Sequence, residues 1–288
     1  MRSLNTWNVG GCCDFFTSPR SVNEAQEAIR FAAGNGSRLY VLGGGSNILV
    51  QDGLLAGVVM HTACLNGIDI SALSDERIVL KVEAGFPVIR LLGLAIKNRW
   101  GGLEFLTGIP GSIGGALWGN TGADGHGFAP HVESIDVIDS HGKLNTLTAT
   151  DLCWNYRQCP CTGMDAIFIT SCTLVLKKNS EEMIFKRIRH FAELKKGQPL
   201  GKKTAGCVFK NPADGISAGR LLDKAGCKGL RVGEAAVSES HANFIENQGN
   251  ATALDIFSLG ELCRELVYLR CGVRLEYEIH FFGDFEKD

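Results

Sequence analysis

The spacing of hydrophobic and polar positions predicts a chain of many short strands. Over Arg77–Ala84 every second residue is apolar, from Ile78 to Ala84, which predicts a strand with one buried face. Apolar runs bounded by glycine or polar residues predict further strands by the same reasoning. These are expected at Arg38–Leu42, Asn47–Val50, Gly57–Thr62, Glu133–Asp139, Lys143–Leu147, Ala166–Lys177 and Arg274–Phe282.

Capping signals mark a smaller number of helices. Ser21 and Glu24 have capping-box spacing, and Gly34 can close the helix that follows in a left-handed conformation. Because helices are few in the first two-thirds of the chain, the pattern indicates an α+β fold. Helices are expected from Ser21 to Ala33, from Pro87 to about Asn98, over Glu181–Lys196 and Ala218–Ala225, and from the Thr252 cap to Cys271.

A glycine-rich stretch, Gly108–Gly127, interrupts this pattern. Eight of its twenty residues are glycine, which is unfavourable for a helix because each glycine costs roughly 0.5–1 kcal/mol relative to alanine. It is also too apolar for a flexible linker. Two interpretations remain open from the stretch alone: a run of tight turns packed on a sheet, or a loop whose backbone N–H groups approach an anionic ligand.

A second loop, in Val41–Asp52, favours the ligand interpretation. The segment has the sequence VLGGGSNILVQD, with Gly43 to Asn47 between two apolar runs. Ile48 stands where the third glycine of a Rossmann fingerprint belongs, and a strand follows instead of a helix. This strand–loop–strand can still hold a pyrophosphate through backbone N–H groups and two polar side chains. Two such loops suit a long dinucleotide better than a single phosphate.

Bulk composition excludes several classes of protein. The 288 residues are 45% hydrophobic and 21% charged, with a net charge of −2, so nothing attracts the chain to nucleic acid or acidic membranes in general. Without an apolar run of membrane-spanning length we expect a cytoplasmic protein without membrane partners. The eleven cysteines lack zinc-ligand spacing, so we predict no metal site and reduced, mostly buried thiols.

Four further features each have a structural and a functional interpretation. The basic run from Lys186 to Lys210 contains eight Lys/Arg against one acid, and it is either a solvated helix face or a landing site for a polyanionic small molecule. Nucleic acid is the weaker option because no aromatic residues are interleaved. Arg157 is either a surface residue or aimed at a carboxylate or phosphate. Cys207 is one cysteine among eleven, and Glu276 and Glu278 share one face of the last predicted strand.

These segments together resemble UDP-N-acetylenolpyruvoylglucosamine reductases, flavoenzymes of bacterial peptidoglycan precursor synthesis. Seven motifs occur in the family's order, and the specificity lies in the series rather than in any one of them. They are Asn5-Thr6, Val41–Asp52, Leu103-Glu104-Phe105 with Gly108–Gly127, Tyr156-Arg157, Gly206–Pro212, Val237–Asn247 and Leu275–Ile279.

The resemblance implies a particular architecture. Residues 1–190 should form a two-lobed FAD-binding domain of the PCMH/vanillyl-alcohol-oxidase type, with lobes of about 1–75 and 76–190. Residues 191–288 should form an α+β substrate-binding domain, of the shorter family type without the extra substrate loop. The positions implied for FAD contact are Gly43, Gly44, Gly45, Ser46, Asn47, Gly108, Ile109, Pro110, Gly111, Ser112, Gly114, Gly115, Asn120 and Gly122.

The resemblance also implies a chemistry, that of a UDP-N-acetylmuramate dehydrogenase. NADPH reduces FAD, and flavin N5 then delivers hydride to the enolpyruvyl group of a small-molecule substrate, UDP-N-acetylglucosamine enolpyruvate. Charge on the resulting enolate would be stabilised by Arg157 and Glu278, a contribution of about 3–4 kcal/mol per donor in comparable sites. Cys207 would donate the proton, and Lys210 and Asn211 would hold the substrate. The enzyme is expected to be a monomer.

The chain departs from the family pattern in two places. Most members have serine where this chain has Cys207; a thiol is the better acid but cannot donate once ionised, so we predict an activity loss at alkaline pH. Thr121 and Asp124 replace a more usual alanine and tyrosine beside the expected flavin contacts. Two alternatives stay open: another flavin oxidase or dehydrogenase on the same cofactor fold, and a catalytically silent protein that binds nucleic acid through the basic run.

Overall fold

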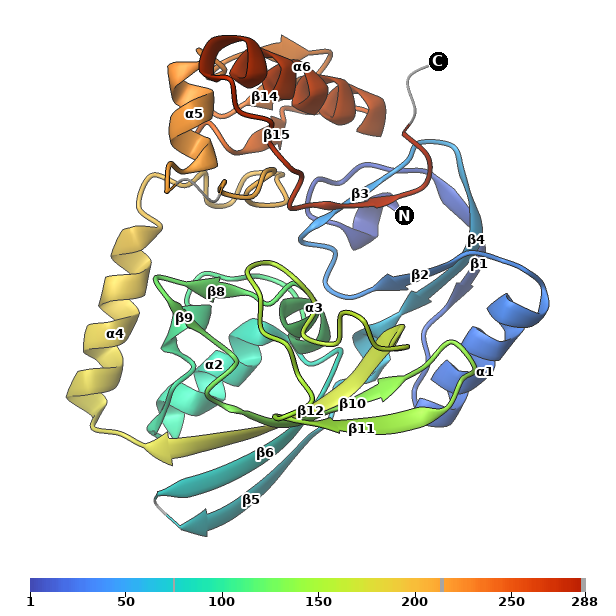
Figure 1. Ribbon diagram of the computed structural model, residues 1–288, viewed down its shortest axis with the longest axis vertical. Helices are drawn as coiled ribbons and strands as arrows, with labels where there is room; N and C mark the ends of the chain where they lie inside the picture. The colour runs from blue at the N-terminus through green and yellow to red at the C-terminus, as the bar shows by residue number, and fades with distance from the viewer. Residues whose placement is uncertain (75, 213–214, 286–288) are drawn as a thin grey trace. The chain divides into compact units, whose positions relative to one another are not determined.

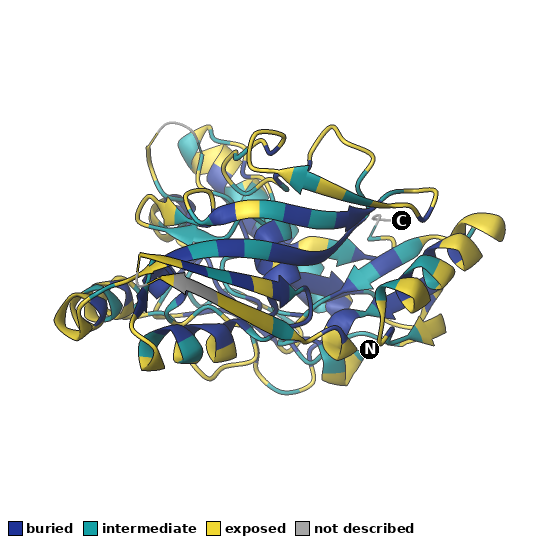
Figure 2. Ribbon diagram, turned by 90° about the horizontal axis from the view of Figure 1, so that it is seen from below, coloured by how far each residue is buried: buried dark blue, intermediate teal, exposed yellow. Residues whose placement is uncertain are grey.

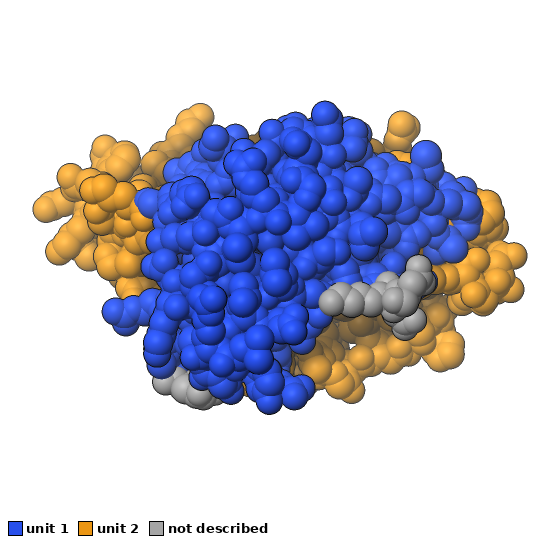
Figure 3. Space-filling view, turned by 90° about the horizontal axis from the view of Figure 1, so that it is seen from above, with its two compact units in different colours: residues 1–14, 45–56, 197–288 blue, residues 15–44, 57–196 orange. Residues whose placement is uncertain are grey.

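The computed structural model describes residues 1–74, 76–212 and 215–285. The chain forms two compact units, coloured separately in Figure 3. It passes between them several times before residue 197. Unit 1 comprises Met1–Asp14, Gly45–Ala56 and Gly197–Asp288, and unit 2 comprises Phe15–Gly44 and Gly57–Lys196.

Unit 2 contains an antiparallel sheet with the strand order β11-β10-β12-β6-β5 (Figure 1). The predicted hairpin is present as β10 and β11, and the long apolar run forms the central strand, β12. Short β7 pairs with the end of β12. The strands are β5 (Ile68–Ser74), β6 (Arg77–Glu83), β7 (Trp100–Gly101), β10 (Val132–Ile138), β11 (Leu144–Thr148) and β12 (Phe168–Lys178).

Helices α2 (Val88–Lys97) and α3 (Ile113–Trp118) contribute to the core that this sheet builds. Leu91 from α2 and Ile113 from α3 are buried in one cluster with Leu80 and Leu174 of the sheet. Most residues of the central strand β12 are buried, whereas the helices turn exposed residues outward (Figure 2). The alternation that predicted β6 from sequence is present in its burial pattern.

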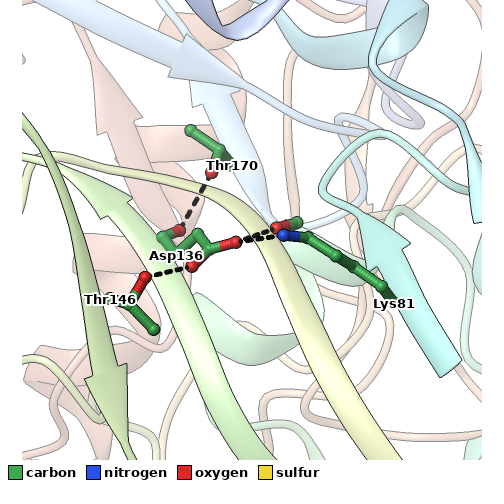
Figure 4. Close-up of polar contacts among 5 residues, drawn as sticks. Lys81, Asp136, Thr146 and Thr170 are labelled. Carbon is green, nitrogen blue, oxygen red and sulfur yellow. Dashed lines mark hydrogen bonds and ion pairs between the residues drawn. The ribbon is translucent and has the colours of Figure 1, made fainter. Parts of the chain in front are cut away.

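A partly buried carboxylate connects four neighbouring strands on this sheet (Figure 4). Asp136 accepts hydrogen bonds from the hydroxyls of Thr146 (2.7 Å) and Ser171 (2.8 Å) and pairs with Lys81 Nζ at 2.8 Å. Its backbone carbonyl accepts from the Thr170 hydroxyl. Burial alone would raise the pKa of Asp136, but the contacts to Lys81, Thr146 and Ser171 outweigh it and lower the pKa.

The first predicted helix is among the other elements that lie before residue 197, where the chain contributes to both units. Ser21 caps it as expected, because its hydroxyl accepts from Glu24 N at 3.2 Å. Gly34 still lies in the helix, and Gly36 (φ +60°) takes the left-handed position instead. The elements are η1 (Arg2–Leu4), β1 (Cys12–Thr17), α1 (Val22–Gly34), β2 (Leu39–Leu42), β4 (Leu54–His61), η2 (Thr62–Cys64), η3 (Glu104–Leu106), β8 (Gly122–Ala123), β9 (His126–Gly127) and α4 (Glu181–Leu194).

Unit 1 is built around helix α6 (Ala253–Cys271). The predicted Thr252 cap is confirmed and is a capping box, since Thr252 and Asp255 exchange both hydrogen bonds, and Gly272 (φ +70°) ends the helix. Trp7 is fully buried in this unit's core. Strand β16 pairs in parallel with β3. The other elements are β3 (Ile48–Val50), α5 (Ala218–Lys224), β13 (Arg231–Val232), β14 (Ala235–Val237), β15 (Ile245–Asn247) and β16 (His280–Phe282).

Three further predictions are wrong. The glycine-rich stretch does contain a helix, α3, because four of its six residues are buried against the core and packing outweighs propensity. The last strand is shorter than Arg274–Phe282, and before His280 it makes only an isolated bridge between Phe209 and Tyr277. The free cysteines are not mostly buried, because only Cys161, Cys172, Cys227 and Cys263 are.

Among the described residues, no helix is both long and apolar enough to span a membrane. The expected lobe boundary falls on residue 75, which lies outside the described residues. The compact units also group residues 1–14 and 45–56 with the C-terminal third.

Candidate active site

The two glycine loops predicted from the sequence meet inside unit 2. A Cβ on Gly44 would lie 2.5 Å from Gly111 Cα, and a Cβ on Gly43 would lie 2.5 Å from Ser112 Oγ. At Gly44 the contact is with backbone atoms, whereas at Gly43 it is with the end of the Ser112 side chain. The close approach of the two backbones therefore requires glycine at position 44.

Ser112 has the environment expected of a ligand contact. It is 4% exposed, and its Oγ has no hydrogen-bond partner among the described residues. An unpaired buried hydroxyl costs free energy unless a ligand or water satisfies it. Gly43, Gly44 and Gly111 lie around Ser112, and we call these four residues the glycine cradle. The cradle fits a cofactor whose polar atoms can contact backbone in a narrow space. The residues present therefore fit FAD.

Gly114 is explained by packing. A Cβ there would lie 2.6 Å from Ala84 Cβ, and Gly114 N donates to Ala84 O at 2.8 Å. Ile113 N likewise donates to Phe86 O. Glycine at 114 thus allows α3 to approach the end of β6, and α3 in turn positions Ser112 at its start.

Arg157 is held in a strained backbone conformation in unit 2. Its φ is +52°, a left-handed value unusual for arginine. The guanidinium donates to Asn120 O (3.3 Å) and Gly122 O (3.4 Å) and lies over the Tyr156 ring, 5.2 Å from its centroid. Asn120 Nδ2 in return donates to Asn155 O at 2.6 Å. The arginine loop and the end of the glycine-rich stretch are therefore tied together.

In unit 1, the segment after Cys207 is paired with the segment that carries Glu278. Glu278 N donates to Val208 O at 2.8 Å, and Lys210 N donates to Glu276 O at 2.9 Å. The half-buried Cys207 directly precedes this paired segment. Lys210 Nζ lies 3.6 Å from a Glu276 carboxylate oxygen. Glu276 and Glu278, which shared one face of the predicted strand, therefore differ in their contacts, because the ion pair with Lys210 is made by Glu276.

Asn47 connects the first glycine loop to the same segment. Its side-chain amide donates to Glu278 O at 3.0 Å, and its own carbonyl accepts from His280 N at 3.0 Å. Gly45 (φ +64°) precedes it, where a Cβ would lie 2.0 Å from Leu4 O. Asn211, a predicted substrate contact, accepts from Ala218 N with its side-chain oxygen and so supports the start of α5.

The predicted site residues fall into two groups, one in each unit. Unit 2 holds Gly43, Gly44, the glycine-rich stretch and Arg157, and unit 1 holds Gly45 to Asn47, Cys207, Lys210, Asn211 and Glu278. The association of these two groups in one site remains a prediction.

Sequence reasoning missed two supporting residues. Asn243 is buried and clamps Phe209, accepting from its N–H at 2.9 Å and donating to its carbonyl at 2.8 Å. Lys195 Nζ donates to Thr107 O, at the entrance to the glycine-rich stretch. Lys195 belongs to the basic run and Asn243 to the Val237–Asn247 motif, so both stood in recognised segments. Neither had a local pattern that indicated its partner.

A comparison of the sequence with known protein families also indicates an FAD site. Residues 13–148 match the model of an FAD binding domain. Together with the α+β fold, this confirms the predicted fold class, a flavin-binding domain of the PCMH type followed by a C-terminal α+β domain. By fold and site the protein is therefore a flavoprotein with an FAD-binding domain.

Residues 198–282 match the C-terminal domain of UDP-N-acetylenolpyruvoylglucosamine reductase. Proteins of that name from Desulforamulus reducens (36% identity; 99% of this chain, 92% of the relative) and Protochlamydia amoebophila (37%; 98% and 91%) are similar over nearly their whole length. The crystal structure of the Thermus caldophilus reductase (MurB) superposes with a TM-score of 0.82 at 31% identity, covering 98% of this chain and 96% of that one. The chain belongs to the UDP-N-acetylenolpyruvoylglucosamine reductase family.

Proposed function

We propose that this enzyme uses NADPH to reduce UDP-N-acetylglucosamine enolpyruvate to UDP-N-acetylmuramate in peptidoglycan precursor synthesis. One observation carries the proposal within the fold: Glu278 N bonds to Val208 O at 2.8 Å. The thiol expected to donate the proton and the carboxylate expected to act on the enolate are thereby on adjacent, paired segments. Family membership supports the same reaction.

The residues that would hold FAD are those of the two meeting loops, Gly43 to Asn47 and Gly108 to Gly122. Bound FAD would supply hydride-transfer chemistry. Ser112 Oγ would donate to or accept from a polar group of the cofactor, which would satisfy a buried hydroxyl that the described residues leave unpaired. The glycine cradle would exclude water from the cofactor's backbone contacts.

Residues of the chain itself would stabilise the developing negative charge and donate the proton. Arg157, held by two backbone carbonyls, would present positive charge to the substrate carboxylate as the enolate forms. The Cys207 thiol would donate a proton to the carbon that bears the ether oxygen. Lys210 and Asn211 would orient the sugar nucleotide, and the basic run would attract its diphosphate and the phosphates of NADPH.

The organisation predicted from sequence is part of this proposal. Residues 1–190 would act as the two-lobed FAD domain and residues 191–288 as the substrate domain. Arg157 from the first would act together with Cys207 and Glu278 from the second. We propose that the enzyme works as a cytoplasmic monomer on a small-molecule substrate.

Isotope labelling tests the assignment of hydride and proton. The reaction is run in D₂O with unlabelled NADPH, and the lactyl group of the product is analysed by NMR. We expect one solvent deuteron at the ether-bearing carbon and a methyl group with a hydrogen from NADPH. Cys207→Ala should abolish protonation, Cys207→Ser should restore part of it with a weaker alkaline loss, and Cys12→Ser should behave as wild type. An unchanged pH profile in Cys207→Ser would exclude the thiol as donor.

A further inference from the structure

Three cysteines lie in the connection between β11 and β12, the segment that also carries Arg157. Cys153 N donates to Pro160 O at 2.9 Å and closes this connection into a loop. Arg157 stands inside the loop, two residues before Cys159. Cys161 follows Cys159 with one proline between them.

The Cys159–Thr162 turn brings two of the thiols together. Thr162 N donates to Cys159 O at 3.0 Å, so residues 159–162 form a β-turn with proline in its favoured second position. Cys161 N donates to Cys159 Sγ at 3.4 Å, so the turn holds the backbone of one cysteine against the sulfur of the other. Alternate residues of a β-turn lie within the Cα separation that a disulfide requires.

The two thiols differ in exposure and in acidity. Cys159 is half-buried, whereas Cys161 is 2% exposed. The thiol and the amide of Cys161 both donate to the Cys159 sulfur, which lowers the pKa of Cys159 although burial opposes this. The same hydrogen bond, and then burial, raises the pKa of Cys161. A thiolate that is reachable from solvent and has a second thiol beside it is the usual arrangement of a peroxide-reactive cysteine.

We propose that Cys159 is a site of oxidation by hydrogen peroxide and that Cys161 resolves the product to an intraloop disulfide. The Cys159 thiolate attacks one peroxide oxygen, the O–O bond breaks, and a sulfenic acid and a hydroxide form. The Cys161 sulfur then attacks the Cys159 sulfur; the S–O bond breaks as the S–S bond forms, and the second hydroxide leaves. Each hydroxide takes up a thiol proton, so two thiols and one peroxide yield one disulfide and two waters.

Oxidation at Cys159 changes the loop that holds Arg157. Thr162 Oγ1 donates to Cys159 O at 2.6 Å, and Arg157 depends on its strained φ of +52° to reach Asn120 and Gly122. Drawing the two sulfurs to bonding distance shifts the backbone beside this residue. A displacement of about 1 Å at a positioned catalytic group can cost about 100-fold in rate. This consequence rests on the proposed function, whereas the oxidation itself does not.

The chain contains a matched internal control. Cys227 and Cys263 in unit 1 are also hydrogen-bonded thiols, and the bond from Cys263 lowers the pKa of Cys227. Both are fully buried, at 0% and 1% exposure. If solvent access decides reactivity, peroxide should oxidise the Cys159–Cys161 pair and leave this pair reduced.

Peptide mapping of the folded holoenzyme tests the proposal. After brief peroxide treatment and alkylation, the peptide with Cys159 and Cys161 should be lighter by two hydrogens and unalkylated, and dithiothreitol should reverse this. Cys159→Ser should abolish the change and Cys153→Ser should not. A Cys153–Cys159 disulfide, equal oxidation of Cys227 and Cys263, or an unmodified Cys159 would each overturn it.

A parallel assay separates this site from the proposed reaction. Oxidised enzyme should reduce the enolpyruvyl substrate at least about tenfold more slowly, while bleaching of the flavin by NADPH is unchanged. Disulfide formation with an unchanged rate would overturn the link to Arg157 alone. Absence of substrate reduction in the reduced enzyme would contradict the proposed function and leave the peptide map to decide the oxidation.

Discussion

The side-chain amide of Asn47 donates a hydrogen bond to the backbone carbonyl of Glu278 at 3.0 Å. These residues lie 231 positions apart in the chain, and the contact links the first glycine loop to the segment of the proposed catalytic carboxylate. His280 N returns a bond to Asn47 O. One asparagine therefore joins the Gly45–Ala56 segment of unit 1 to its C-terminal segment by two hydrogen bonds.

Removing this amide should destabilise the protein. In Asn47→Ala the partly buried Glu278 carbonyl loses its donor, which we expect to cost about 1–3 kcal/mol in the free energy of unfolding. Urea denaturation measures the loss. Asn66→Ala is the control, because its amide donates to Ala63 O on an exposed turn. Equal effects of the two substitutions would show that the Asn47 contact has no special role.

Gly44→Ala should disrupt the meeting of the two loops. The new Cβ would lie 2.5 Å from Gly111 Cα, and backbone atoms must move to admit it. We expect a loss of about 1–3 kcal/mol in stability and weaker FAD binding, measured by urea denaturation and by flavin titration. Gly93→Ala is the control, since its Cβ meets no atom within 4 Å in α2, and it should stabilise by about 0.5–1 kcal/mol. Wild-type flavin affinity in Gly44→Ala would count against the cradle.

Trp7 should be a large contributor to unit 1. Its ring is fully buried and Nε1 donates to Ile245 O at 2.8 Å. Trp7→Ala should therefore lower the free energy of unfolding by about 3–5 kcal/mol, because a cavity forms and a buried carbonyl is left unpaired. Leu269→Ala on the exposed face of α6 should change it by less than about 0.5 kcal/mol. A small effect at Trp7 in chemical denaturation would contradict the assigned packing.

Asp136 should give the protein an acid-sensitive part of its stability. Its folded pKa lies below the unfolded value of about 3.9, so its contribution is complete above that value and is lost as pH falls through the folded pKa. Asp136→Asn should cost about 1–3 kcal/mol at neutral pH. The difference from wild type should shrink as pH falls below the unfolded value. Glu27→Gln, on an exposed helix face, should show no such trend in urea unfolding.

Sequence patterns predicted much of the fold because the signals were local. The period-2 alternation located β6, and the Thr252–Asp255 capping box located the start of α6. The helix within the glycine-rich stretch was missed, because burial against the sheet decided it. Strands β1 and β5 were also missed: β5 is an outer strand, and β1 exposes Phe15 and Phe16, so neither has the alternation of a half-buried strand.

The contacts that support the candidate site residues were not predictable from the sequence. The glycine loops and the Cys207 and Glu278 segments stood out as motifs, and their pairing partners lie far away in the chain. Nothing local indicates that Asn243 clamps Phe209 or that Arg157 adopts a left-handed backbone. Trp7, which had no interpretation from sequence, is explained only by the core that distant residues build around it.

An anaerobic flavin absorbance titration in two steps tests the central claim most directly. NADPH is added first to the FAD-loaded enzyme, and UDP-N-acetylglucosamine enolpyruvate second. The account predicts that the flavin bleaches in the first step and that its yellow absorbance returns in the second, with one equivalent of each reactant. Bleaching that the sugar nucleotide does not reverse would contradict the proposed substrate, and a protein that takes up no flavin at all would contradict the whole account.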